Sequence, residues 1–175
     1  MNNAKYPTPQ LGKNVYIAPT SYVAGSVIVG DDVTIMHHVV IRGDIATIRV
    51  GNRCNIQDGS VLHTRYGVDL DIGDEVGVGH RAVVHCRRVG RGTLIGIGSI
   101  VLDNAEVGAG CVVAAGAVVT PGMIVPDGKL VAGVPAKVIR DVGERDHEYM
   151  RHVIESYIKV GREHAEGKWP AVTNQ

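Results

Sequence analysis

Two histidines in the stretch VGVGHRAVVHC, residues 76–86, are candidate metal ligands or acid–base groups. His80 and His85 lie five residues apart there, in a run made mostly of Val, Gly and Ala. Imidazole nitrogens bind divalent metals and exchange protons near neutral pH. A five-residue spacing puts two side chains on different faces of a helix and on opposite sides of a single strand. What the two histidines can do together therefore depends on the element that positions them.

A six-residue apolar repeat identifies that element. An apolar residue recurs at hexad spacing, apart from three interruptions, at Ile17, Val23, Val29, Ile35, Ile41, Val50, Ile56, Leu62, Ile72, Val78, Val84, Val89, Ile95, Val101, Val107, Val113, Val119, Val125 and Val131. This period fits neither an α-helix nor a coiled coil. It fits a parallel β-helix, in which each hexad is a short strand with a corner and three hexads close one triangular coil. The sequence predicts an all-β, parallel β-helix domain over residues 1–140.

The rhythm changes at three places. Segment 41–50 carries three extra residues, segment 62–72 carries four, within HTRYGVDL, and segment 84–89 is one residue short. Insertions in a solenoid bulge at the corners, commonly on the functional face.

The pattern becomes helical after VAGVPAKVIRD. Residues 141–166 are expected to form one α-helix packed on the outside of the coil, followed by a tail over 167–175. Its apolar stripe consists of Tyr149, Met150, Val153, Ile154, Tyr157, Ile158 and Gly161.

Counting hexads assigns His63 and His85 to one column. Residues at the same hexad position of successive coils stack about 4.8 Å apart. The position directly after the inward-pointing apolar residue is occupied by Arg42, His63 and His85 in three successive coils. These three side chains are predicted to point outward, one above another.

His80 falls in a different column, at a corner, together with Asp58 and His37. Its distance from His85 spans two faces, up to about 16 Å of chain. That is too far for one metal, whose imidazole nitrogens lie at about 2.0–2.1 Å. If coils associate about a threefold axis, the His80 column of one chain can face the His63 and His85 column of the next. Three imidazoles then converge and leave an open position for water.

The same packing would place Arg42 against Asp58 of the neighbour as a charge-complementary pair. His37 and His38 are read as surface or interface residues, with His37 at the edge of the site. The remaining histidines are expected on the terminal helix in solvent or packing roles: His147, His152 and His164.

Composition bears on the kind of partner and on the compartment. The chain of 175 residues has 18 basic and 18 acidic residues, which does not favour nucleic acid or a membrane as its main partner. No apolar leader segment or membrane-spanning run is present in the sequence. The three cysteines, Cys54, Cys86 and Cys111, fit a reducing compartment, so we expect a cytoplasmic protein. All three are read as small packed hydrophobes, with Cys86 also kept as a weak candidate for metal binding or redox chemistry.

Four motifs resemble the γ-class carbonic anhydrases, a family of trimeric left-handed β-helices built from hexapeptide repeats. They are IRGD at 41–44, NIQDGSVLH at 55–63, VGHRAVVH at 78–85 and GVPAKVIR at 133–140. The last is shared with hexapeptide acyltransferases and discriminates poorly. The resemblance implies a left-handed coil, a homotrimer, and the reversible hydration of carbon dioxide to bicarbonate by a metal-bound hydroxide.

The resemblance also implies residue roles. His63 and His85 would bind the metal with His80 of the adjacent chain, and Gln57 and Asn55 would hydrogen-bond the bound water or orient the groups that do. An interface network would comprise Arg42, Asp44 and Asp58, and Tyr157 matches a helix tyrosine that reaches the site. Three histidines suit Zn²⁺, and imidazole also accepts Fe²⁺ or Co²⁺.

This chain departs from the family's best-studied members at two positions. Those members carry a glutamate after the Arg-x-Asp motif and a second, proton-shuttling glutamate on an acidic loop. Here Ile45 and the short insert TRYGVD stand instead. Tyr66 is too weak an acid to shuttle protons well, which leaves Asp69 or buffer. The pattern resembles the subclass that lacks these glutamates.

Two other functions stay open from the sequence. One is a CoA-dependent acyltransferase, which shares the coil and the GVPAK ending. The other is a non-catalytic, metal-stabilised trimeric scaffold or binding protein.

Overall fold

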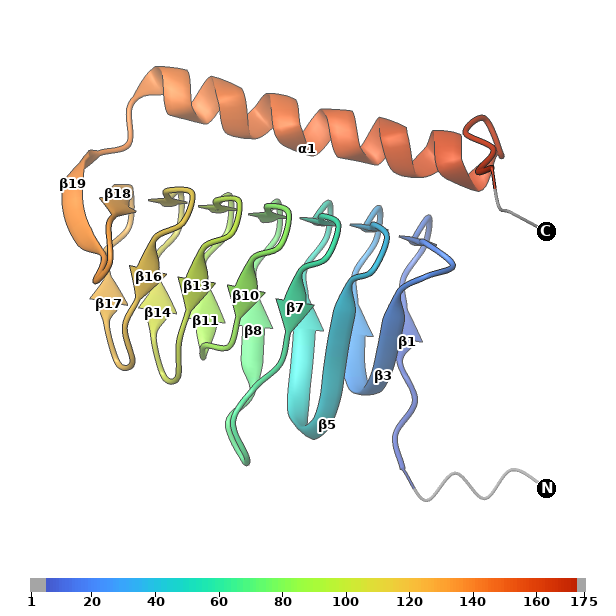
Figure 1. Ribbon diagram of the computed structural model, residues 1–175, viewed down its shortest axis with the longest axis horizontal. Coiled ribbons are helices and arrows are strands. Elements are labelled where there is room, and N and C mark those ends of the chain that lie inside the picture. The colour runs from blue at the N-terminus through green and yellow to red at the C-terminus, as the bar shows by residue number, and fades with distance from the viewer. Residues whose placement is uncertain (1–5, 173–175) are drawn as a thin grey trace.

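The computed structural model describes residues 6–172, and it is a parallel β-solenoid with one helix on its outside. The coils stack along one axis, and α1 (Glu144–Ala165) runs along that stack (Figure 1). The predicted parallel β-helix with an external C-terminal helix is confirmed. The tail expected from residue 167 is described only to residue 172.

The strands form two sheets. The larger sheet contains β1 (Gln10–Leu11), β3 (Tyr22–Val29), β5 (Val40–Val50), β7 (Val61–Leu62), β8 (Leu70–Ile72), β10 (Val83–Val84), β11 (Arg88–Val89), β13 (Ile100–Val101), β14 (Glu106–Val107), β16 (Val118–Val119) and β17 (Ile124–Val125). Its order is β16-β13-β10-β7-β5-β8-β11-β14-β17, with β3 paired to β5 and β1 to β3. Because β5 pairs with both β7 and β8, this sheet wraps two faces of the coil.

The smaller sheet forms the third face. It contains β2 (Tyr16–Ile17), β4 (Thr34–Ile35), β6 (Asn55–Ile56), β9 (Gly77–Val78), β12 (Leu94–Ile95), β15 (Val112–Val113), β18 (Lys129–Ala132) and β19 (Lys137–Asp141). Its order is β19-β18-β15-β12-β9-β6-β4-β2. The solenoid strands pair in parallel, whereas β19 turns back and pairs antiparallel with β18 at the C-terminal end.

The core is the stack of inward-pointing hexad residues. Ile35, Ile41, Ile56 and Leu62 are all fully buried, and no aromatic side chain belongs to this cluster. Successive coils are only about 4.8 Å apart, so short and β-branched side chains fill the interior of a narrow coil. The absence of Phe from the sequence follows the same requirement.

The two insertions are accommodated differently. The first does not form a loop: β5 continues around the corner as one strand, Val40–Val50. Gly43 lies against the backbone of Ser26 there, where a Cβ would have no room. The second forms a loop after His63, closed by a hydrogen bond from Thr64 Oγ1 to the Val68 carbonyl.

Helix α1 packs on the smaller sheet, where it contacts β2, β4, β6 and β9. Its buried residues are Met150, Ile154, Ile158 and Gly161. Tyr149, expected in the apolar stripe, is 59% exposed instead. It belongs to the adjoining row with Val153 and Tyr157, which borders an open apolar cavity.

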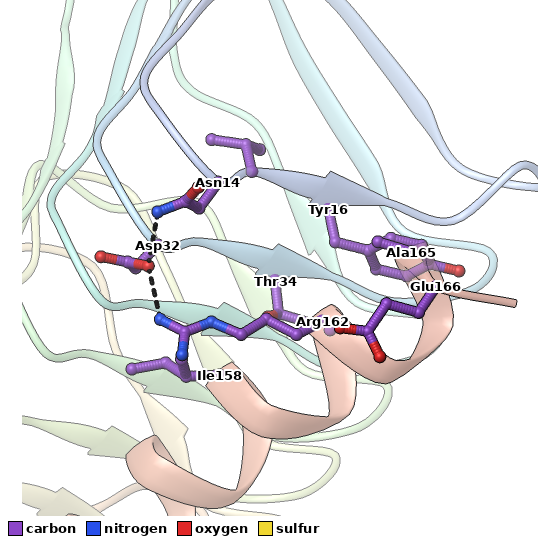
Figure 2. A pocket seen from close by; sticks show the side chains of 10 residues that line it. Asn14, Tyr16, Asp32, Thr34, Ile158, Arg162, Ala165 and Glu166 are labelled. Carbon is purple, nitrogen blue, oxygen red and sulfur yellow. Dashed lines mark hydrogen bonds and ion pairs between the residues drawn. The ribbon is translucent and has the colours of Figure 1, made fainter. Parts of the chain in front are cut away.

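The C-terminal half of α1 is fixed to the first coils (Figure 2). Arg162 donates to Asp32 Oδ1 at 3.1 Å, and Asn14 donates to the same oxygen at 3.2 Å. Thr34 Oγ1 donates to the Tyr157 carbonyl at 2.9 Å, next to Gly161, where a Cβ would meet the threonine side chain. These contacts set the height of Tyr157 on the coil.

The helix start is also anchored. Asp146 accepts a hydrogen bond from the Gly143 amide at 2.8 Å and a two-pronged one from Arg140 at 2.6 and 3.0 Å. The Arg140 guanidinium, helped by that amide, lowers the pKa of Asp146 to about 2.

Within residues 6–172, no helix is long and apolar enough to cross a membrane.

Candidate metal centre

The predicted column of one arginine and two histidines is present. Ile41 pairs with Leu62, and Leu62 with Val84, so the next residue of each strand stacks in register. The column therefore consists of the side chains that follow these pairs: Arg42, His63 and His85.

The two histidines of the column face each other. His63 Nδ1 lies 3.2 Å from His85 Nε2, and the ring centroids are 5.2 Å apart. Two nitrogens bound tetrahedrally to one metal at about 2.0–2.1 Å would be separated by about 3.3 Å. The spacing of these nitrogens fits two ligands of a single ion.

Carboxylates hold the outer nitrogens of both rings. Asp44 Oδ1 lies 3.1 Å from His63 Nε2, and Asp103 Oδ1 lies 2.5 Å from His85 Nδ1. A carboxylate only accepts, so each outer nitrogen carries the proton and each facing nitrogen of a neutral ring carries a lone pair. Two facing lone pairs repel each other unless a cation lies between them. The donor set therefore fits a divalent metal.

Arg42 completes this part of the site by pairing with Asp44. Partial desolvation opposes ionisation of Asp44, but the hydrogen bonds from Arg42 and His63 outweigh it and hold the pKa of this carboxyl below its usual range. Asp44 therefore stays a hydrogen-bond acceptor for His63 at neutral pH. We call this group the His63 half: Arg42, Asp44, His63, His85 and Asp103.

His80 lies in a second group at another corner. Its Nδ1 is 3.1 Å from Asp58 Oδ2, its Nε2 is 3.2 Å from the Tyr157 hydroxyl, and its backbone amide donates to Gln57 Oε1 at 3.2 Å. Asp58 fixes the Nδ1 proton and leaves Nε2 as an acceptor. Burial, with a smaller contribution from Asp58, raises the pKa of Tyr157, so its hydroxyl remains a donor.

Two buried amides adjoin His80. Gln57 Nε2 donates to Asn55 Oδ1 at 2.9 Å, and both residues are buried. Asn55 Nδ2 is buried without a hydrogen-bond partner among the described residues. We call this second group the His80 half: Asn55, Gln57, Asp58, His80 and Tyr157.

The nine residues singled out from the sequence thus separate into two halves on one chain. Within the described residues, no group of three His, Cys, Asp or Glu side chains on this single chain could hold a metal. This division is what the hexad count predicts, since it assigns His63 and His85 to one column and His80 to another.

The corner column of His37, Asp58 and His80 is also present. The Gly59 amide donates to the His37 carbonyl, and the Arg81 amide donates to the Asp58 carbonyl, so successive coils bring these positions into line. His147, His152 and His164 lie on α1, as expected.

Cys86 does not fit the metal or redox role kept open for it. Its thiol is buried in the core, and burial raises its pKa to about 12. Cys54 is held in the same way, with its pKa raised to about 12 by burial. Both are neutral thiols that pack as small apolar side chains.

Asp103 is a functional candidate that the sequence reasoning missed. Segment 84–89 is one residue short, so Val84 pairs with Val101, 17 residues later instead of 18. The residue directly above His85 is therefore Leu102, and Asp103 comes one position after it. Only the turn geometry brings its carboxylate to His85 Nδ1. An acidic residue one coil above a candidate ligand is the signal that could have found it.

Comparisons with known proteins show the family of this chain. A carbonic anhydrase of Geobacillus kaustophilus is 46% identical over 158 residues, covering 90% of this chain and 87% of that protein. Gamma carbonic anhydrase 2, mitochondrial, of Arabidopsis thaliana is 35% identical over 164 residues, covering 90% of this chain and 59% of that protein. The chain belongs to the γ-class carbonic anhydrase-like family.

This family lies within the hexapeptide-repeat proteins. A model of the bacterial transferase hexapeptide family, with six repeats, matches residues 8–43 and 88–121. The crystal structure of a hexapeptide transferase family protein from Anaplasma phagocytophilum has a TM-score of 0.83 and 38% identity, covering 88% of this chain and 91% of that one. The γ-class members and the transferases thus share the coil, so the coil by itself does not decide the chemistry.

Proposed function

We propose that this chain forms a homotrimer that reversibly hydrates carbon dioxide, with a divalent metal held by His63 and His85 of one subunit and His80 of the next. The observation that carries the proposal is the pair of facing imidazole nitrogens, 3.2 Å apart, each backed by a carboxylate. The His80 half supplies a third imidazole with the same kind of carboxylate support. A trimer would join the two halves and leave a fourth position for water.

The face that carries the His63 half supports association. An outward-pointing apolar row runs beside the histidine column along β5, β7, β10, β13 and β16, and each of its members is half-buried: Val40, Val61, Val83, Ile100 and Val118. Helix α1 packs on the smaller sheet and does not contact these strands to any comparable extent. A second copy of the chain would cover this row, and the exposed charges of Arg42 and Asp58 would then pair across the interface.

A metal held by His63, His85 and the neighbouring His80 would lower the pKa of a bound water toward about 7 and so supply hydroxide for attack on carbon dioxide at neutral pH. The protein's part is orientation. Asp44, Asp58 and Asp103 each hold the proton of one ligand ring on its outer nitrogen. His80 Nε2 would give its lone pair to the metal in place of the Tyr157 hydroxyl. That hydroxyl and the Gln57 and Asn55 amides would then be hydrogen-bond groups for the substrate. Bicarbonate leaves, and one proton must be exported in each turnover.

Zn²⁺ suits this donor set, and Fe²⁺ or Co²⁺ are the alternatives to be tested. Protein prepared without oxygen should contain about one metal per chain, run as a trimer, and accelerate carbon dioxide hydration. His80→Ala should lose both metal and activity. Metal-loaded trimer that hydrates no carbon dioxide with Zn²⁺, Fe²⁺ or Co²⁺ would reject the enzymatic proposal and favour a metal-stabilised scaffold.

An acyltransferase is the second candidate, favoured by the match to the bacterial transferase hexapeptide family. Acetyl-CoA should then raise the midpoint of thermal unfolding by mass action. The carbon dioxide proposal expects no such shift, and His80→Ala separates the two functions because only the metal site requires all three imidazoles.

A further inference from the structure

We propose that His37 accepts the proton released at this site and passes it to buffer in solution. The inference rests on the proposed function and adds a proton-transfer residue to it. Hydration converts carbon dioxide and water into bicarbonate and one proton. That proton would move through intervening water to His37 Nε2 and then to a buffer base, so that His37 returns to its neutral form in each cycle.

The corner column gives His37 its position. His37, Asp58 and His80 occupy successive coils at one corner, linked by the backbone hydrogen bonds of Gly59 and Arg81, 2.9 Å each. Suppose that corresponding coils of adjacent subunits lie at the same height in the trimer. His63 is then one coil above His37 and His85 two coils above it, so a metal between them would lie one and a half coils higher than His37, about 7 Å along the axis. One or two water molecules can bridge that distance.

The imidazole of His37 is held but still reaches solvent. Its Nδ1 lies 2.9 Å from Thr20 Oγ1, and its ring meets the edge of the His164 ring at a centroid distance of 5.9 Å. The residue is half-buried. In the tautomer whose Nδ1–H donates to Thr20 Oγ1, Nε2 carries the lone pair that takes the incoming proton.

Several ionisable groups surround His37. His38 lies beside it, at 6.3 Å between ring centroids, and His164 on α1 stacks in turn on Tyr16. Asp58 lies in the next coil of the same corner. In the proposed trimer Arg42 of the adjacent subunit would stand at the level of His37, with its charge offset by Asp44.

The other candidate groups are less suited to carry the proton. Asp69 accepts hydrogen bonds from the Thr47 amide at 3.0 Å and from Arg49 at 2.9 Å, and these, the backbone one foremost, hold its pKa below the usual value. Tyr157 has a pKa raised by burial. Neither group exchanges protons efficiently at neutral pH, whereas imidazole ordinarily titrates near pH 6.5.

His37→Gln tests the inference, with His152→Gln on the exposed side of α1 as the matched control. In weak buffer, His37→Gln should lower kcat about tenfold or more and leave kcat/KM unchanged, because proton export limits only the full turnover. Added imidazole should restore kcat. The control should match the wild type at every buffer concentration.

A second measurement does not depend on activity. His37→Gln should hold as much metal per chain as the wild type, because His37 is not one of the proposed ligands. Loss of metal in this variant would overturn the inference, as would a His37→Gln enzyme whose kcat depends on buffer as the wild type does. Wild-type protein that shows no hydration with any metal or buffer would instead reject the proposed function itself.

Discussion

At the scale of single residues, three carboxylates define the chemistry by fixing one proton each. Asp44, Asp58 and Asp103 each lie within about 3 Å of one imidazole nitrogen of His63, His80 or His85. A carboxylate partner fixes the tautomer and increases the basicity of the opposite nitrogen. The carboxylates thus fix which nitrogen of each ring carries the lone pair, as the proposed metal site requires.

Asp103→Asn removes that support from His85 alone. The asparagine amide can donate as well as accept. It therefore no longer selects the His85 tautomer in which Nδ1 carries the proton and Nε2 presents its lone pair to His63. Metal affinity should fall about 10- to 100-fold, measured by competition with a chelator of known affinity. Asp71→Asn, which changes an exposed partner of Arg49 on another face, is the control. Unchanged affinity in Asp103→Asn would show that the His85–Asp103 contact does not tune the site.

At the scale of elements, α1 matters because it carries Tyr157 to His80. The close approach of Gly161 to Thr34 and the bond from Thr34 to the Tyr157 carbonyl fix the helix on β4. Gly161→Ala should force the helix outward and cost about 1–3 kcal/mol of unfolding free energy. Adding Thr34→Ala makes room for the new methyl group, so the double variant should recover part of that loss in urea unfolding. A double variant less stable than the sum of the two single changes would contradict this account.

The start of the helix gives a pH prediction. The pKa of Asp146 is lowered from 3.8 to about 2 in the folded chain, so its bonds to Arg140 and Gly143 stabilise the fold fully above about pH 4. That contribution disappears as the pH falls through about 2. Asp146→Asn should therefore be less stable than the wild type at pH 7, by about 0.5–2 kcal/mol. The difference should shrink between pH 4 and pH 2 when both proteins are unfolded by urea; a constant difference would assign the effect to something other than ionisation.

The period of six was sufficient to predict the coil, its inward-pointing residues and the His63 and His85 column. Each of these follows from counting residues along a regular repeat. The two features that the count missed both lie where the repeat is irregular. The shortened segment 84–89 puts Leu102 in register with His85, so only the turn that follows brings Asp103 to His85. The strand β5 absorbs its three extra residues by continuing, because Gly43 allows the backbone to pass close to Ser26. Turn geometry and contacts with the distant helix, such as Tyr157 to His80, are set by packing and not by the period.

At the scale of the whole molecule, the separation of the two halves predicts complementation between inactive variants. His63→Ala damages only the His63 half, and His80→Ala damages only the His80 half. Neither variant alone can form an intact site in the proposed trimer. The two variants are then unfolded together and refolded into mixed trimers. Where the His63 half of a His80→Ala chain meets the His80 half of a His63→Ala chain, the interface is complete. Metal binding and hydration should therefore reappear in the mixture, at a fraction of the wild-type level.

The control for that experiment is a mixture of His63→Ala with His85→Ala, which damages the same half twice. It should stay inactive, since no pairing of its chains restores the His63 half. Recovery in this control, or no recovery in the first mixture, would contradict a site shared between chains.

The reversed direction of β19 has a consequence for how the molecule ends. A parallel solenoid exposes unpaired backbone amides and carbonyls on its last coil, and such an edge can template the addition of another molecule. Across the smaller sheet, β19 occupies the edge of β18 in the antiparallel sense, with each of its residues exposed. Addition of a further parallel strand to β18 is thereby obstructed at this edge, while the apolar row on the side of the coil stays available for lateral contacts.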